Sequence, residues 1–141
     1  MALINFFSED IHYTLKEKTY IRKWLTQAIL LEKKKLKEVN FIFCSDNYLL
    51  EINQQYLKHD TFTDIVTFDN SETKDLIVGD IFISIERVRA NALIFNVSER
   101  DELHRIIIHG TLHLLGYKDK SKVDKGVMTG KEDYYLGLRE G

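Results

Sequence analysis

The chain has 141 residues, of which 44% are hydrophobic, so we expect one domain with a substantial core over residues 1–141. Its formal net charge of −2 excludes a strongly basic protein, and any contact with nucleic acid must depend on local basic patches. The single cysteine excludes an intramolecular disulfide, and no apolar run approaches the roughly 18 residues of a transmembrane helix. We therefore expect a soluble, cytoplasmic protein with no membrane partner.

The first third of the chain alternates between strand and helix patterns. Two β-rich pieces, 3–7 and 11–15, flank a polar turn and favour a first strand or a hairpin. Apolar residues at helical spacing follow Thr19 and predict a helix. Residues 39–44 then have the pattern of a buried strand, in which we expect Cys44 to be a small apolar filler, not a ligand or nucleophile.

The middle of the chain predicts two further helices with two strands between them. In chain order these are a helix capped by Ser45 or Asp46, a polar loop at 57–64, strands at 65–68 and 76–85, and a helix from about 86 to 92 or beyond.

The last third predicts a buried helix followed by a covering one. Ser98 and Asp101 resemble a capping box, and the apolar residues that follow surround the helix axis almost completely, which is typical of a buried helix. A final helix is predicted over 122–138. The fold class is therefore α+β, a compact domain with a mixed sheet of about four strands packed with about five helices.

The buried helix carries a pattern typical of a metal site. His109 and His113 are four residues apart, which places them about 40° apart around the axis and ~6 Å along it, so both can reach one ion. Gly116 ends the helix and lets the chain turn back, which can bring Asp119 to a third vertex. Three protein ligands with an open position indicate a catalytic metal, so we predict a metal-dependent hydrolase.

Two other interpretations of the histidine pair must be weighed. Both rings could be core histidines satisfied by the backbone, but neutral imidazoles buried side by side need hydrogen-bond partners or a cation. Zinc proteases place a glutamate directly after the first histidine as general base, and Gly110 stands there. His104 lies roughly 140–180° around the helix from the pair, so it is structural or on the surface. The spacing does not place His12 or His59.

The stretch 109–119 resembles the signature of the YbeY family of rRNA-maturation endoribonucleases, His-Gly-x-Leu-His-Leu-x-Gly-Tyr-Asp-His. Residues 52–56 and 60–68 are similar to a second family block, and 79–84 to its Gly-Asp-Ile-x-Ile-Ser strand. The resemblance implies a single α+β domain that uses a divalent ion, commonly Zn²⁺, to cleave single-stranded RNA. It also implies a role in 16S rRNA 3′-end maturation and ribosome quality control, with rRNA and the ribosome or ribosomal proteins as partners.

The first departure from the family pattern concerns the third metal ligand. Aligned without a gap, Asp119 occupies the position of the family's third histidine; a one-residue insertion would instead place Lys120 there. Because a protonated lysine cannot bind a cation, we prefer the ungapped alignment. A carboxylate ligand makes the site one charge less positive and shifts its preference toward oxygen-binding ions such as Mn²⁺.

The second departure concerns a catalytic cation. The family places an arginine after its tyrosine, and Leu57 stands at that position. Lys58 or His59 of the same loop can supply the charge; alternatively, Lys58 and His59 are both solvated loop residues. His109 and His113 are the other expected catalytic residues. Lysine offers a point charge and not a bidentate fork.

Cationic segments offer candidate RNA contacts, although each is equally a solvated face. They are Lys33–Lys35 with Lys37, the pair Arg87 and Arg89, and the lysines at 118, 120 and 122. Two other functions remain open. One is a metallopeptidase, and the other is a ribosome-associated metal-binding module without turnover.

Overall fold

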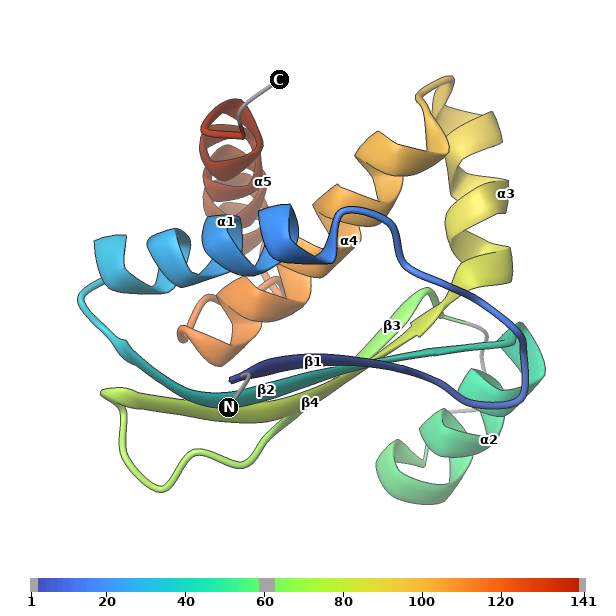
Figure 1. Cartoon of the computed structure of the whole chain (residues 1–141), viewed down its shortest axis with the longest axis horizontal. Coiled ribbons are helices and arrows are strands. Elements are labelled where there is room, and N and C mark those ends of the chain that lie inside the picture. The colour runs from blue at the N-terminus through green and yellow to red at the C-terminus, as the bar shows by residue number, and fades with distance from the viewer. Residues whose placement is uncertain (1–2, 59–62, 140–141) are drawn as a thin grey trace.

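The computed structural model describes residues 3–58 and 63–139 as a mixed sheet of four strands packed with five helices, which confirms the predicted α+β fold (Figure 1). In chain order the elements are β1 (Ile4–Ser8), α1 (Lys18–Leu31), β2 (Lys35–Cys44), α2 (Asp46–Leu57), β3 (Ile65–Asp69), β4 (Leu76–Ser84), α3 (Ile85–Phe95), α4 (Glu99–Leu114) and α5 (Lys122–Gly137). Among the described residues, no helix is long and apolar enough to cross a membrane.

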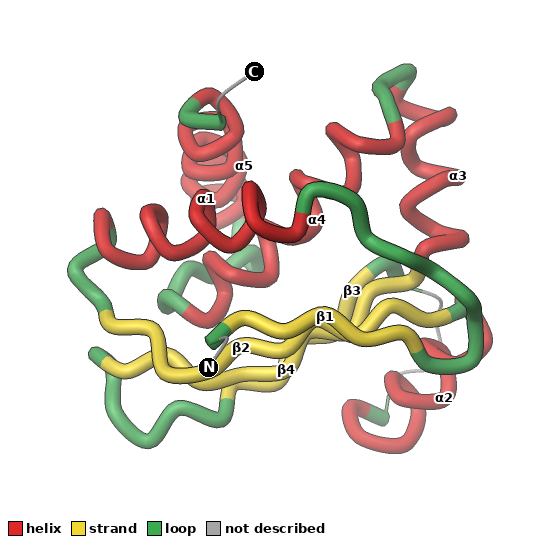
Figure 2. Tube along the Cα trace, viewed as in Figure 1, coloured by secondary structure: helices red, strands yellow, loops and turns green. Residues whose placement is uncertain are grey.

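The sheet has the strand order β1-β2-β4-β3, in which the first three strands are parallel and β3 is antiparallel to β4. The possible hairpin between 3–7 and 11–15 does not form. Instead, β1 pairs with β2, with Phe6 opposite Phe41, and 11–15 connects β1 to α1 as a loop (Figure 2). This loop still buries Leu15 in the core, which explains its apolar alternation.

The helices cover the two faces of the sheet unequally. Helices α1, α4 and α5 lie over one face and α2 lies on the other (Figure 1). The larger core fills the first side, where Ile107 and Leu112 of α4 are fully buried. A smaller cluster lies under α2 and includes Cys44, whose thiol is buried as predicted. Helix α4 is therefore held between the sheet and other helices, and few of its side chains reach solvent.

Candidate metal centre

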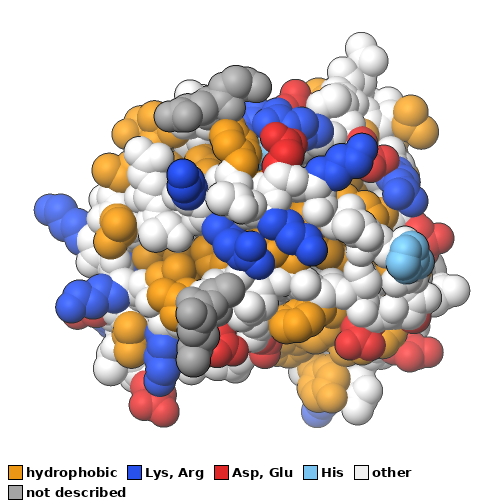
Figure 3. Space-filling view, in the orientation of Figure 1, with side chains coloured by type: hydrophobic (Ala, Val, Ile, Leu, Met, Phe, Trp, Pro, Cys, Tyr) orange, Lys and Arg blue, Asp and Glu red, His pale blue; other side chains and the backbone are white. Residues whose placement is uncertain are grey.

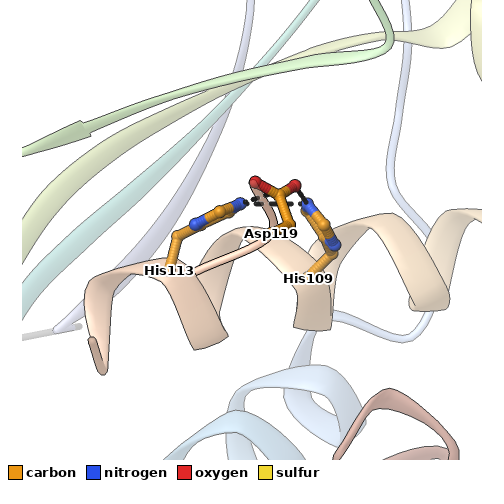
Figure 4. A group of neighbouring side chains, drawn as sticks. All are labelled: His109, His113 and Asp119. Atoms are coloured by element: carbon orange, nitrogen blue, oxygen red, sulfur yellow. Dashed lines mark hydrogen bonds and ion pairs between the residues drawn. The ribbon is translucent and has the colours of Figure 1, made fainter. Parts of the chain in front are cut away.

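Three side chains meet at the C-terminal end of α4. The Nε2 atoms of His109 and His113 lie 3.1 Å apart, and Oδ2 of Asp119 lies 3.3 Å from each of them (Figure 4). Each of the three side chains remains partly exposed. The structure thus brings together the three side chains that the spacing predicts as ligands, and they could hold a metal ion.

The turn after α4 is built by hydrogen bonds that a glycine makes possible. Gly116 has a φ of 104°, and its N–H donates to the carbonyl of His113. The N–H of Tyr117 donates to the carbonyl of Leu112, and this pair of bonds is a Schellman motif. The motif ends the helix and reverses the chain, so that Asp119 returns over the two histidines.

Both histidine rings are held by their other nitrogen. Nδ1 of His113 lies 3.1 Å from the carbonyl oxygen of Tyr117, and Nδ1 of His109 lies 2.6 Å from Oε2 of Glu132. Because a carbonyl only accepts hydrogen bonds, His113 must carry its proton on Nδ1. A neutral His109 that donates to the Glu132 carboxylate also carries its proton on Nδ1. Both Nε2 atoms then present lone pairs toward Asp119.

This donor set fits a divalent cation. Three acceptor atoms, two imidazole nitrogens and one carboxylate oxygen, converge at 3.1–3.3 Å with no hydrogen between them once both histidines are neutral. A tetrahedral ion with bonds of ~2.0–2.1 Å would separate its ligand atoms by about 3.3 Å. Like lone pairs repel at this distance, so the arrangement needs a positive charge at its centre, and a divalent ion satisfies it.

The charge around His109 acts in the same direction. Burial alone would lower the pKa of this histidine, but the hydrogen bond to Glu132 and the charges of Glu132, Asp119 and Asp64 raise it above its ordinary value. The surroundings therefore favour a cation at this point, either a proton on the ring or a metal ion beside it.

A cavity of about 950 Å³ opens beside His109 and Asp119, large enough for part of a substrate. Asp64, directly before β3, and Glu102 of α4 both line it, and burial raises the pKa of each carboxyl group. Asn91 donates a hydrogen bond of 3.3 Å to Asp64. The wall of the cavity thus carries carboxyl groups that hold protons more readily than exposed ones do.

His104, His12 and Lys58 lie apart from this centre. His104 is 2% exposed, packs against the Trp24 ring and accepts from Arg139 through Nδ1, so it is structural. His12 is exposed on the loop after β1. Lys58 is the exposed C-cap of α2, the helix that lies on the other face of the sheet (Figure 1), and His59 lies outside the described residues.

The basic segments differ in whether their charges are already paired with carboxylates. Arg87 pairs with Asp46, and Arg89 pairs with Glu99 at 3.0 Å, so both arginines already have carboxylate partners. The lysines that flank Asp119, at 118 and 120, are exposed. On the face in Figure 3, lysine and arginine side chains lie scattered among acidic and apolar ones. The described surface there has no continuous basic track.

Two residues near the centre cannot be identified from the motif alone. Glu132 comes from α5, 23 residues after the histidine that it contacts. The signal for it is a glutamate at helical spacing with the buried Met128 and Tyr135, because a charged residue on an inner face needs a partner. Asp64 belongs to a quoted family block, but its place in the cavity depends on β3 packing beside α4.

Comparison with known proteins agrees with this geometry. The family model described as Endoribonuclease YbeY matches residues 4–138. A protein of Cytophaga hutchinsonii named Endoribonuclease YbeY is 53% identical over 97% of this chain and 96% of its own. One of Flavobacterium psychrophilum with the same name is 54% identical over 94% of each chain. The solution structure of a Thermotoga maritima protein matches with a TM-score of 0.66 and 28% identity, over 94% of this chain and 86% of the other. These similarities show that the chain, in which His109, His113 and Asp119 converge, belongs to the Endoribonuclease YbeY family.

Proposed function

We propose that this protein is a metal-dependent endoribonuclease that cleaves single-stranded RNA at the centre formed by His109, His113 and Asp119. The family to which the chain belongs supports the endoribonuclease activity. The observation that carries the metal dependence is the convergence of three acceptor atoms at 3.1–3.3 Å. We propose Zn²⁺ as the ion, with Asp119 making Mn²⁺ a better competitor than at a site with three histidines.

The division of labour among the residues follows from their positions. A bound divalent ion supplies Lewis-acid polarisation of a phosphate oxygen and a lowered pKa of water. His109, His113 and Asp119 hold it at the mouth of the cavity, where a phosphodiester can approach. Because Lys58 lies at the end of α2, apart from this centre, we propose His59 of the following loop as the cation that stabilises the additional negative charge of the transition state.

The cellular role is proposed from the family. We infer that the protein acts in the cytoplasm on rRNA, in 16S rRNA 3′-end maturation and ribosome quality control, with the ribosome or ribosomal proteins as partners. The name shared by the relatives, Endoribonuclease YbeY, supports an RNA substrate.

The packing of Gly110 argues against a metallopeptidase. A Cβ at this position would lie 2.9 Å from Cδ1 of Ile65 and 3.0 Å from Cγ2 of Ile81. The position directly after the first histidine therefore faces the sheet and not the metal centre. A glutamate there would neither fit nor reach the ion as a general base.

The test is the metal content and the RNA cleavage of one set of purified proteins. We expect about one ion per chain in the parent, and loss of both ion and cleavage in Asp119→Ala and in His113→Ala. His12→Ala is the matched control, because it removes an exposed histidine outside the centre, and it should keep both properties. A parent that binds the ion but cleaves no RNA would overturn the proposed activity and favour a ribosome-associated module without turnover.

A further inference from the structure

Helix α5 supplies no metal ligand, yet one of its side chains contacts a ligand ring. Oε2 of Glu132 lies 2.6 Å from Nδ1 of His109, and the Glu132 side chain is only 9% exposed. This contact lies on the side of the ring opposite Nε2, the atom that faces Asp119. Glu132 therefore acts on the orientation of His109 without competing with it for an ion.

The glutamate is itself held in place. Nη1 of Arg105 donates to Oε1 of Glu132 at 2.8 Å, which leaves Oε2 for the histidine. Nη2 of the same arginine donates to Asp133 at 2.7 Å. Because Arg105 and His109 are both on α4, one turn apart, the two carboxylates of α5 grip a single face of α4. The carboxylate of Glu132 thus has both oxygens engaged and little rotational freedom.

The two ligand histidines are held differently. His113 has a neutral partner, the Tyr117 carbonyl on the turn after α4, whereas His109 has a carboxylate. A carboxylate accepts more strongly than a carbonyl and increases the basicity of the opposite ring nitrogen. His109 is for this reason the ligand whose affinity for an ion depends on a side chain that can be removed by mutation.

We propose that Glu132, fixed by Arg105, is the positioning residue of the metal centre: it holds the His109 proton on Nδ1 and aims Nε2 at the ion. The inference rests on the proposed metal site and assigns to α5 the task of setting its affinity. Removing such an outer partner lowers metal affinity by about 10- to 100-fold in comparable sites.

The first measurement is the Zn²⁺ affinity of the full chain, by competition with a chromophoric chelator and without RNA. We expect Glu132→Ala to weaken binding by about 10- to 100-fold. Glu132→Gln should fall between Glu132→Ala and the parent, because one amide oxygen cannot serve both His109 and Arg105. Asp133→Ala is the matched control: it removes the neighbouring Arg105 partner but touches no ligand, so its affinity should stay within about twofold of the parent. Equal affinity in Glu132→Ala and the parent, or equal losses at Glu132 and Asp133, would overturn the proposal.

The second measurement is independent of metal. Nitrogen-detected NMR of the His109 ring in the metal-free chain, at a pH where the ring is neutral, should place its proton on Nδ1 in the parent and in Asp133→Ala. In Glu132→Ala the Nε2-protonated form should appear. If Glu132→Ala does not fold, the affinity of Glu132→Gln decides. A parent that binds no Zn²⁺ would overturn the proposed function, while an unchanged tautomer would overturn only the role of Glu132.

Discussion

The hydroxyl of Tyr117 donates a hydrogen bond of 2.6 Å to Glu32, which ties the turn after α4 to the end of α1. Tyr135 and Lys131 of α5 also donate to this carboxylate. Burial would raise the pKa of Glu32, but these three donors hold it below its ordinary value. The residue whose carbonyl holds His113 is therefore anchored by an ionised carboxylate, two residues before the ligand Asp119.

Tyr117→Phe should lower the free energy of unfolding by about 1–2 kcal/mol, because Glu32 keeps two of its three donors. Metal affinity should change little, since the backbone carbonyl that holds His113 remains. Urea denaturation and chelator competition measure the two effects. Tyr134→Phe, an exposed hydroxyl on α5, is the control and should change stability by less than about 0.5 kcal/mol. Equal effects of the two substitutions would contradict the anchoring role.

Gly116→Ala should lower both stability and metal affinity. No atom lies within 4 Å of an added Cβ, so the cost comes from the φ of 104° and should be about 1–2 kcal/mol. Relief of that strain would move Asp119 away from the histidines. Gly130→Ala makes the same chemical change in the middle of α5, again in open space, and should be neutral or stabilising by up to about 1 kcal/mol. Thermal unfolding and Zn²⁺ titration of both variants would show whether the turn, and not glycine content, is responsible.

Asp119→His should retain the ion that Asp119→Ala loses, because an imidazole can replace the carboxylate as third ligand. The exchange removes one negative charge, so the ratio of Zn²⁺ to Mn²⁺ affinity should rise. Parallel titrations with the two ions measure this ratio. Equal metal content in Asp119→Ala and the parent would remove Asp119 from the ligand set.

Protonation of His104 should destabilise the fold as the pH falls. Burial and the neighbouring Arg139 lower its pKa from 6.5 to about 4. As the pH falls, His104 therefore binds a proton in the unfolded chain before it does so in the folded one. Its contribution to the free energy of unfolding is complete above pH 6.5 and is lost as the pH falls toward 4. Protonation of His104 can lower the free energy of unfolding by at most about 3 kcal/mol. His104→Gln keeps an acceptor for Arg139 but does not titrate, so the difference between parent and variant in urea denaturation should shrink as the pH falls. A difference that stays constant with pH would show that His104 does not cause the loss of stability at low pH.

The lysines at 118 and 120 should contribute to RNA affinity without sequence preference. Both are exposed beside Asp119, where a bound RNA backbone would pass. A double alanine variant should bind all single-stranded sequences more weakly and flatten the slope of log affinity against log salt by about 1.4. Arg89→Ala removes a cation that already pairs with Glu99 and should leave the slope unchanged. An unchanged slope in the double variant would reject this segment as a contact.

The local parts of the centre were predictable because they depend on short spacings. Helix geometry places His109 and His113 together, and a glycine after the helix predicts the turn that returns Asp119. Ser45, one of the two candidate caps, and Ser98 both cap helices, each accepting from the backbone N–H three residues later. These features need only a few consecutive residues to form.

The strand prediction that was wrong and the residue that was missed both depend on contacts between segments far apart in the sequence. The piece 11–15 has strand-like alternation, but β1 finds its partner in β2, some 35 residues later, and a pattern in one segment cannot reveal which strand it pairs with. Glu132 was missed for the same reason, since its partner is on another helix. The electrostatic roles of Lys58 and His59 stay predictions.

The contacts of α5 also have a consequence for biosynthesis. The three proposed ligands precede residue 120, but the groups that hold His109 and the turn after α4, through Glu132 and Glu32, extend to Tyr135. A nascent chain that has just exposed these three residues therefore lacks the carboxylate that holds His109. An ion at the proposed centre should be captured tightly only after α5 has been synthesised and has docked, so metal loading should follow the packing of α5 against α4.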